Sequence, residues 1–305
     1  MATLNPIVSA ITGYVEEKKT ELIGKSLLDA KSVRHFNLLT GVKGATTLNL
    51  LDTDVVLQDG SDCGFDASGE TKITQRIMQP KVLKCNMEYC DKNLLQTYAN
   101  YMVKVGAGRE ELPFEEKFIG QVVKGVEDAI EKMVWQGASG QTDQWEGFIS
   151  ILNAASAETH NVNAVSGTTA NEFIKNVYLA APSNIVNKED FRIFVSESLY
   201  RQWIQELVAA NMYHYDAKYA EGEYALPGTN VKVIALSGLD GIANYEYAIA
   251  ARESNLFYGV DLSDDSEVFD FWFSKDDRVF KLAIEFLGGN QVAYPDEVVV
   301  GKLAK

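Results

Sequence analysis

A stretch rich in glycine and aspartate, flanked by strand-like segments, most constrains how this chain can fold. Residues 59–69 form its centre, and residues 54–58 and 71–84 carry the β-branched and alternating side chains of two strands joined by an open turn. An arm of some twelve residues would span roughly 40 Å, because a strand rises about 3.3 Å per residue. Since an isolated two-stranded hairpin is only marginally stable in water, we expect this hairpin to lie on a partner surface.

The strongest helix signal covers residues 113–136. Pro113 suits a first helical turn, and Glu115 and Glu116 place negative charge near the positive end of the helix dipole. Apolar residues then recur with the helical period, at Phe114, Phe118, Val122, Val126, Ile130, Met133 and Val134. Gly137 follows where a C-cap is expected. The pattern predicts one long amphipathic helix with a buried stripe.

The N-terminal third has weaker patterns. Residues 6–30 predict an amphipathic helix, which is either a packed first helix or an arm that lies on a neighbour. Residues 32–49 contain glycines and no strong period, so we expect a loose connection there. Apolar residues near 88–105 predict a further helix.

The remainder of the chain predicts a second, mixed domain from residue 141 to about 276. Thr169 and Glu172 form a capping-box pattern ahead of a helix, and a second helical face includes Leu199, Trp203, Ile204, Leu207 and Val208. Strand patterns cover residues 191–195, 231–236, 245–251, 268–273, 278–286 and 291–300, with Gly288, Gly289 and Pro295 as punctuation. Helices and strands alternate, and the fold class expected for the whole chain is α+β.

Composition excludes several classes of protein. The chain has 305 residues, of which 46% are hydrophobic, so it can bury a large core. No apolar run reaches about 18 residues and no signal-peptide pattern is present, so we expect a soluble protein with no membrane contact. A net charge of −15 without a cluster of lysine and arginine argues against a dedicated nucleic-acid-binding surface. The three cysteines are interpreted as reduced thiols.

Two patterns imitate ligand-binding motifs and fail on their details. A calcium loop would use Asp59, Ser61, Cys63, Gly64 and Glu70, but cysteine replaces an oxygen ligand and the flanks are strands. A dinucleotide fingerprint begins at Gly106 and Gly108 and then has Glu111 at its third glycine position. A solvated turn and a loop that ends a helix are the better interpretations.

The remaining chemical candidates are equally weak. Zinc would need about four nitrogen or sulfur donors, whereas the chain offers Cys85 and Cys90 and three isolated histidines, His35, His160 and His214. Ser139 lacks the final glycine of a nucleophile elbow, and the acidic run at 261–267 is typical of a solvated turn. We therefore expect no catalytic residue, no metal and no cofactor, although a hydrolase with a dispersed active site remains an alternative.

The order of these elements resembles the major capsid proteins of tailed bacteriophages, which have the Hong Kong 97 type of fold. The resemblance covers nearly the whole chain, and its soft sequence signatures lie at residues 57–64, 71–76, 112–116, 133–137, 271–277 and 293–298. It implies an N-terminal arm (1–44), an extended hairpin loop (45–86), a peripheral domain built on a spine helix (87–140 and 276–305) and an axial domain (141–275). Lysine-to-asparagine cross-linking, known in some relatives, cannot be placed on particular residues here.

The resemblance also implies function. Copies of the chain would form the pentamers and hexamers of an icosahedral virion capsid around double-stranded DNA, without sequence-specific binding. The subunit would be made in the host bacterial cytoplasm and would meet other capsid, portal, scaffold or decoration proteins. Six hairpin residues are expected at the contact between subunits, namely Leu57, Asp59, Phe65, Ile73, Gln75 and Arg76. Six residues would characterise the spine helix, namely Pro113, Phe114, Phe118, Val126, Met133 and Trp135. The shell of a bacterial nanocompartment, which encloses enzymes, is the alternative within this fold.

Overall fold

The computed structural model describes residues 4–58, 68–90, 114–213, 222–261 and 268–305, and it has a mixed α+β fold. The helices are α1 (Leu4–Leu28), α3 (Phe114–Gln136), α4 (Phe148–Ala154), α5 (Ala170–Leu179), α6 (Ser183–Val186) and α7 (Glu197–Ala209). The strands are β1 (Asn37–Thr40), β2 (Thr46–Thr53), β3 (Thr71–Met78), β4 (Lys81–Cys90), β5 (His160–Ala164), β6 (Phe191–Ser196), β7 (Glu223–Ala225), β8 (Lys232–Leu236), β9 (Tyr245–Arg252), β10 (Leu256–Val260), β11 (Val268–Ser274), β12 (Val279–Val292) and β13 (Val299–Ala304). Short 3₁₀ helices are η1 (Val33–His35), η2 (Ser237–Leu239), η3 (Glu253–Asn255) and η4 (Pro295–Glu297).

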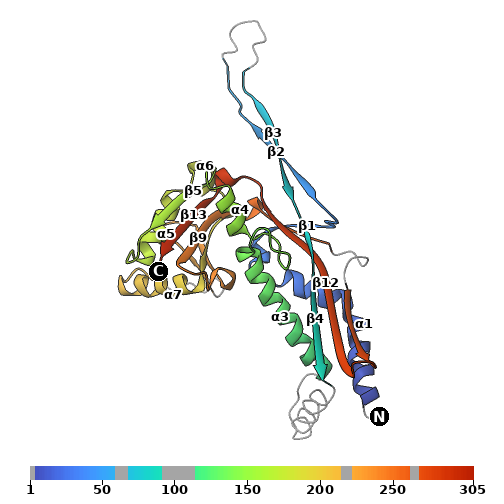
Figure 1. Cartoon of the computed structure of the whole chain (residues 1–305). Helices are drawn as coiled ribbons and strands as arrows, with labels where there is room; N and C mark the ends of the chain where they lie inside the picture. The colour runs from blue at the N-terminus through green and yellow to red at the C-terminus, as the bar shows by residue number, and fades with distance from the viewer. Residues whose placement is uncertain (1–3, 59–67, 91–113, 214–221, 262–267) are drawn as a thin grey trace.

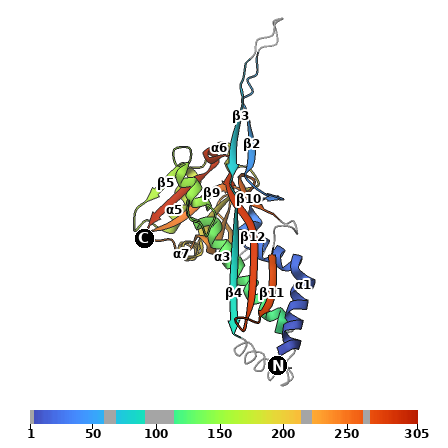
Figure 2. The same cartoon turned by 45° about the vertical axis from the view of Figure 1, so that its right-hand side comes forward.

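These elements form two sheets and a separate hairpin. In the first sheet the long strand β12 pairs with β10 and β11 in succession along one edge and with β4 along the other, and β1 extends it beside β10. The second sheet has the order β5-β13-β9-β6-β8-β7. Strands β2 and β3 pair only with each other. They rise away from the body, while α1, α3 and the first sheet extend in the opposite direction (Figures 1 and 2).

The long helix α3 confirms the predicted helix over Phe114–Gln136. Val126 is 6% exposed and Ile130 is fully buried, and both belong to a core that includes α1 and strands of the first sheet. Phe118 and Met133 are half-buried against this core, and Trp135 is fully buried in an aromatic group. Phe114 is the first residue of the described part of this helix, and Pro113 lies outside the described residues.

The N-terminal helix α1 packs on its own subunit. Ile11, Val15 and Leu27 are buried in the same core as Ile130 of α3. The side chain of Thr12 also donates a hydrogen bond to the carbonyl oxygen of Phe271 in β11, at 3.3 Å. Of the two interpretations of residues 6–30, the packed first helix is therefore the one seen.

The second sheet and its helices are mixed α and β as expected, but the expected bounds of 141 to about 276 do not coincide with one sheet: β10 and β11 belong to the first sheet, and β13 belongs to the second. The α5 and α7 side of the second sheet buries a second core that includes Phe173, Val177, Leu199 and Trp203. The backbone N–H of Glu172 donates to Oγ1 of Thr169 at 3.2 Å, which confirms the predicted helix start. Placing Val208 with the buried residues of α7 was wrong: it is 54% exposed, whereas the adjacent Leu207 is fully buried.

Three predicted boundaries were wrong. Residues 32–49 are not a loose connection, because they hold η1, β1 and the start of β2. The first hairpin strand is Thr46–Thr53, and residues 54–58 that were assigned to it have no regular structure. Residues 88–90 continue β4 rather than starting a helix, and residues 91–105 of that predicted helix lie outside the described residues.

The second hairpin arm and the C-terminal strands also differ from the prediction. Residues 71–84 do not form one strand but divide at Pro80 into β3 and β4. Proline has no backbone N–H to donate to a strand ladder. Strand β4 then pairs with β12 in the first sheet. The predicted strands at 278–286 and 291–300 are instead the continuous β12 and the separate β13. Gly288 and Gly289 lie inside β12 rather than in a break between two strands. A Cβ at Gly288 would lie 2.8 Å from the Trp145 ring, so close neighbours leave no room for a side chain there.

A buried carboxylate connects three segments of the subunit. Glu131 of α3 is 4% exposed and accepts hydrogen bonds from the backbone N–H of Ser32 (2.9 Å), the Ser32 hydroxyl (2.5 Å) and the N–H of Gly238 in η2 (3.4 Å). The indole N–H of Trp135 donates to the same Ser32 hydroxyl, at 2.7 Å. Glu131 thus links the segment after α1, the spine-like helix and the second sheet.

We expect Glu131→Ala to destabilise the subunit. The change leaves the N–H groups of Ser32 and Gly238 without their acceptor, at a cost of about 1–3 kcal/mol for each buried group. Chemical denaturation measures this loss, and Glu131→Gln, which keeps an acceptor oxygen, should lose less. An unchanged denaturation midpoint for Glu131→Ala would contradict this role.

Candidate assembly surfaces

The β2–β3 hairpin has two different faces. Its antiparallel register pairs Thr46 with Met78 and continues in steps to Thr53 with Thr71. Because successive side chains of a strand point to opposite sides, directly paired residues share a face. One face, here called the inner face, has the pairs Thr46/Met78, Leu48/Arg76, Leu50/Thr74 and Asp52/Lys72. The other, the outer face, has Thr47/Ile77, Asn49/Gln75, Leu51/Ile73 and Thr53/Thr71.

The inner face is attached to the body near the base of the hairpin. Leu50 is 7% exposed and Met78 is fully buried. The guanidinium of Arg76 lies 2.5 Å from a carboxylate oxygen of Glu158, in the connection that precedes β5. The side chain of Gln291 in β12 donates to the carbonyl oxygen of Ile77 at 2.7 Å. These contacts fix the direction in which the hairpin leaves the subunit.

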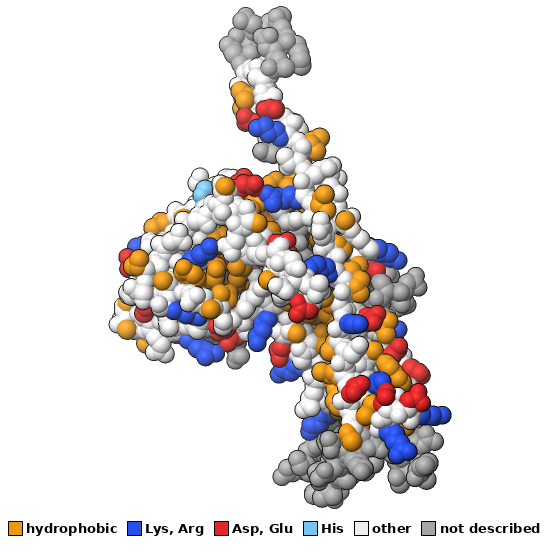
Figure 3. All heavy atoms as spheres, viewed as in Figure 1, with side chains coloured by type: hydrophobic (Ala, Val, Ile, Leu, Met, Phe, Trp, Pro, Cys, Tyr) orange, Lys and Arg blue, Asp and Glu red, His pale blue; other side chains and the backbone are white. Residues whose placement is uncertain are grey.

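The outer face is exposed along its whole length. Leu51, Ile73 and Ile77 are 62%, 71% and 53% exposed. Every other residue of this face is also exposed and none carries a charge. Figure 3 shows hydrophobic side chains on the stalk of the hairpin above the body. Leu51 and Ile73 are directly paired, so the outer face has an exposed aliphatic pair and is a candidate interaction surface.

The two chain segments remain paired for a short distance beyond the ladder. The N–H of Asp54 donates to the carbonyl oxygen of Glu70 at 2.9 Å, and the side chain of Gln58 donates to the Ser68 hydroxyl at 2.5 Å. Gly69 has φ +98°, and a Cβ there would lie 2.5 Å from the carbonyl oxygen of Asp54. Glycine is therefore required where the two segments cross closely.

The expected contact residues divide between these surfaces. Ile73 and Gln75 lie on the outer face, Arg76 lies on the inner face, and Leu57 is 92% exposed beyond the ladder. Asp59 and Phe65 lie outside the described residues. Leu51 and Ile77 of the outer face were not predicted from the sequence. The alternation of leucine with threonine and asparagine over residues 46–51 is the pattern that indicates the strand containing Leu51.

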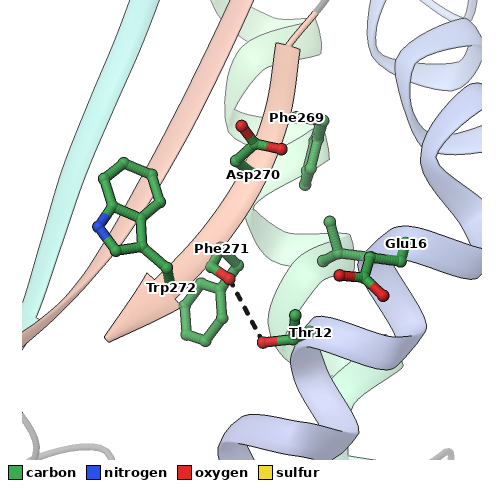
Figure 4. Close-up of a pocket in the computed structure, with 7 residues that line it drawn as sticks. Thr12, Glu16, Phe269, Asp270, Phe271 and Trp272 are labelled. Carbon is green, nitrogen blue, oxygen red and sulfur yellow. Dashed lines mark hydrogen bonds between the residues drawn. The ribbon is translucent and has the colours of Figure 1, made fainter. Parts of the chain in front are cut away.

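A second surface feature lies between α1 and the free edge of β11. It is a pocket of about 320 Å³ lined by Thr12, Val15, Glu16 and residues 269–272 (Figure 4). Trp272 is 43% exposed beside it. The pocket contains two carboxylates, of Glu16 and Asp270, but no nucleophile paired with a base, so it does not form a catalytic arrangement.

The other sequence candidates are not brought together. Among the described residues no group of three or more His, Cys, Asp or Glu side chains is placed to hold a metal ion. The Nδ1 atom of His35 lies 2.8 Å from a carboxylate oxygen of Glu253, as an ion pair or hydrogen bond inside the fold. Cys85 faces the core, where burial raises the pKa of its thiol, and Ser139 is exposed in a turn. His214, Cys63 and Gly106 lie outside the described residues.

Across the described part of the chain, every helix is too short or too polar to span a bilayer.

Comparison with known proteins gives matches at the level of structure. No protein-family model matches the sequence, and no curated protein matches it. A chain from the satellite phage P4 procapsid that includes the size determination (Sid) protein matches with a TM-score of 0.63, 8% identity, and coverage of 93% of this chain and 90% of that one.

Two further solved structures give the same result. A chain of Gordonia phage Cozz matches with a TM-score of 0.58 and 13% identity, over 89% of this chain and 85% of that one. A chain from the capsid of an empty GTA particle matches with a TM-score of 0.57 and 11% identity, over 90% of each chain. The α+β architecture and the resemblance seen in the sequence are thus confirmed at the level of the fold, and the chain has the Hong Kong 97-like fold of tailed-phage and GTA major capsid proteins.

Proposed function

We propose that the chain is a major capsid protein, which assembles into the pentamers and hexamers of an icosahedral phage head enclosing double-stranded DNA. The observation that carries the proposal is the projecting hairpin, with its exposed and uncharged outer face, on a subunit of capsid-protein fold. A closed shell requires each subunit to contact several neighbours, and a projecting hairpin reaches a neighbour without a large apolar patch on the body.

The charge of the subunit fits this role. With a net charge of −15, the chain does not attract DNA as a dedicated DNA-binding protein does. The DNA is held inside by the closed wall rather than by sequence-specific contacts. In this proposal α1 belongs to an N-terminal region (1–44), and α3 is the spine of a peripheral domain (87–140 and 276–305). Strands β5 to β9 belong to the axial domain (141–275), and β13 of the C-terminal segment pairs with their sheet. Portal, scaffold and decoration proteins are the further partners.

Purification of the chain alone tests the proposal. Size-exclusion chromatography and negative-stain microscopy should show capsomers or closed particles, because the contacts between subunits are built into the chain. A small oligomer with a measurable hydrolase turnover would contradict it. Particles that contain enzymes rather than nucleic acid when isolated from their natural source would favour the nanocompartment alternative.

A further inference from the structure

Three polar side-chain atoms in the core beside the first sheet have no hydrogen-bond partner among the described residues. They are Nε1 of Trp145, the hydroxyl oxygen of Tyr258 and Oδ1 of Asn290. Trp145 and Tyr258 are fully buried, and Asn290 is 6% exposed. Most buried polar atoms in folded proteins form hydrogen bonds, because an unpaired atom keeps the full cost of its removal from water. Each of the three atoms is therefore expected to have a partner.

The three side chains are neighbours on one face of the sheet. Tyr258 of β10 and Asn290 of β12 are directly paired in the antiparallel ladder, so their side chains share a face, with Cβ atoms about 4.5–5.5 Å apart. The ring centroid of Trp145 lies 6.2 Å from that of Tyr258. The side-chain amide of Asn290 also donates to the carbonyl oxygen of Glu146, the residue after Trp145, at 3.3 Å. The unpartnered atoms thus belong to one small region between the first sheet and the segment before α4.

The donors and acceptors of this region are complementary to water. The Nδ2 atom of Asn290 lies 3.0 Å from the carbonyl oxygen of Val134 and 3.3 Å from that of Glu146, which makes Oδ1 the free acceptor. The indole N–H of Trp145 can only donate, whereas the Tyr258 hydroxyl can donate or accept. Burial raises the pKa of Tyr258, so this hydroxyl keeps its proton. A water molecule offers two donors and two acceptors, and buried waters form about three hydrogen bonds to such groups.

The same surroundings argue against a charged or larger ligand. None of the three side chains carries a charge, and an ion buried here without a counter-ion would be unfavourable by many kcal/mol. Trp145 also packs against aromatic and backbone neighbours: its ring centroid lies 6.2 Å from that of Phe286, and a Cβ at Gly288 would lie 2.8 Å from its ring. A small neutral molecule that both donates and accepts hydrogen bonds fits these surroundings, and water is that molecule.

We propose that the core of the subunit contains a buried water-binding site, in which water bridges Nε1 of Trp145, the hydroxyl of Tyr258 and Oδ1 of Asn290. The bridge extends the bond that Asn290 already donates to Val134 near the end of α3. It joins β10, β12 and the segment before α4 by polar contacts. Because all of these residues belong to one chain, the site does not depend on how subunits assemble.

Tyr258→Phe tests the site by the sign of its effect on stability. With water bound, loss of the hydroxyl removes a hydrogen bond and should lower the melting temperature of the full chain by about 2 °C. With an unpaired hydroxyl, the same change would remove a desolvated polar group and raise the melting temperature. Tyr245→Phe is the matched control, because Tyr245 is 42% exposed and its hydroxyl can bond to solvent. This control should melt as the wild type does.

An experimental structure of the wild-type chain, at a resolution that shows ordered water elsewhere in the core, gives the direct measurement. The expected result is density for a water at about 2.7–3.2 Å from at least two of the three atoms. An unchanged or raised melting temperature for Tyr258→Phe would overturn the site. A structure in which the three atoms contact no water, or bond directly to one another, would overturn it as well.

Discussion

Replacing residues 51–73 by a short Gly-Ser linker is expected to abolish shell formation while the subunit remains folded. The change removes the Leu51/Ile73 pair and everything beyond it, but it keeps the inner-face pair of Leu50 and Thr74. A linker of four or five residues can close the remaining strands, because loops of this length are common in hairpins. Both cores lie outside the deleted segment. Circular dichroism should therefore be unchanged, and microscopy should show only small capsomers or monomers.

The melting temperature is the internal control for this deletion. It should move by no more than a few degrees, since exposed residues of the hairpin contribute little to the free energy of unfolding. Shells of normal size from the shortened chain would show that the hairpin is not needed between subunits. A collapsed melting transition would instead show that the hairpin supports the fold of its own subunit.

Val126→Asp is expected to prevent the subunit from folding. Val126 is 6% exposed in the core that α3 shares with α1 and the first sheet. An aspartate here would place a charged carboxylate among apolar side chains, and burying an unpaired charge lowers the free energy of unfolding by several kcal/mol. That loss is comparable to the whole stability of a typical domain, about 5–15 kcal/mol. We expect insoluble protein, measured as the fraction in the soluble phase after expression.

Gln121→Asp is the matched control on the same helix. Gln121 is exposed, so the added charge remains in water, where a surface substitution usually changes stability by less than about 0.5 kcal/mol. Soluble Gln121→Asp with insoluble Val126→Asp would support the assignment of the buried face. A soluble and well-folded Val126→Asp subunit would show that this face of α3 does not carry the core.

The sequence predicted α3 well because its signal is long and unambiguous. The apolar stripe from Phe118 to Val134 repeats with the helical period, and Gly137 follows its end. The structure shows a different reason for this glycine: its φ is not positive as in a glycine C-cap, and a Cβ at Gly137 would lie 2.1 Å from the carbonyl oxygen of Trp145. Tertiary packing rather than capping therefore requires glycine there.

The hairpin was predicted to exist, but its first strand was misplaced. Val55, Val56 and Leu57 have the composition of a strand, yet they lie beyond the ladder and are exposed. Residues 46–53 form β2 instead, because this register places Leu50 on the inner face that meets the body. That choice depends on contacts with distant residues, which a single-sequence pattern does not contain.

The residues of the outer face could be only partly predicted. Ile73 and Gln75 were among the residues that the resemblance placed at the contact between subunits, whereas Leu51 and Ile77 required the register of β2 and β3. Arg76 was expected at the same contact, but the structure places it in an ion pair with Glu158 of its own chain. In a polar strand, the sequence alone does not show on which face an arginine lies, because this depends on how the strand pairs.

Reconstruction by electron cryo-microscopy of the particles formed by the wild-type chain tests the central claim most directly. The account predicts closed icosahedral shells built from pentamers and hexamers. In each of them the outer face of one hairpin, at Leu51 and Ile73, should lie against a neighbouring subunit. A discrete small oligomer in place of shells, or shells in which the hairpins point into solvent without touching a neighbour, would contradict it.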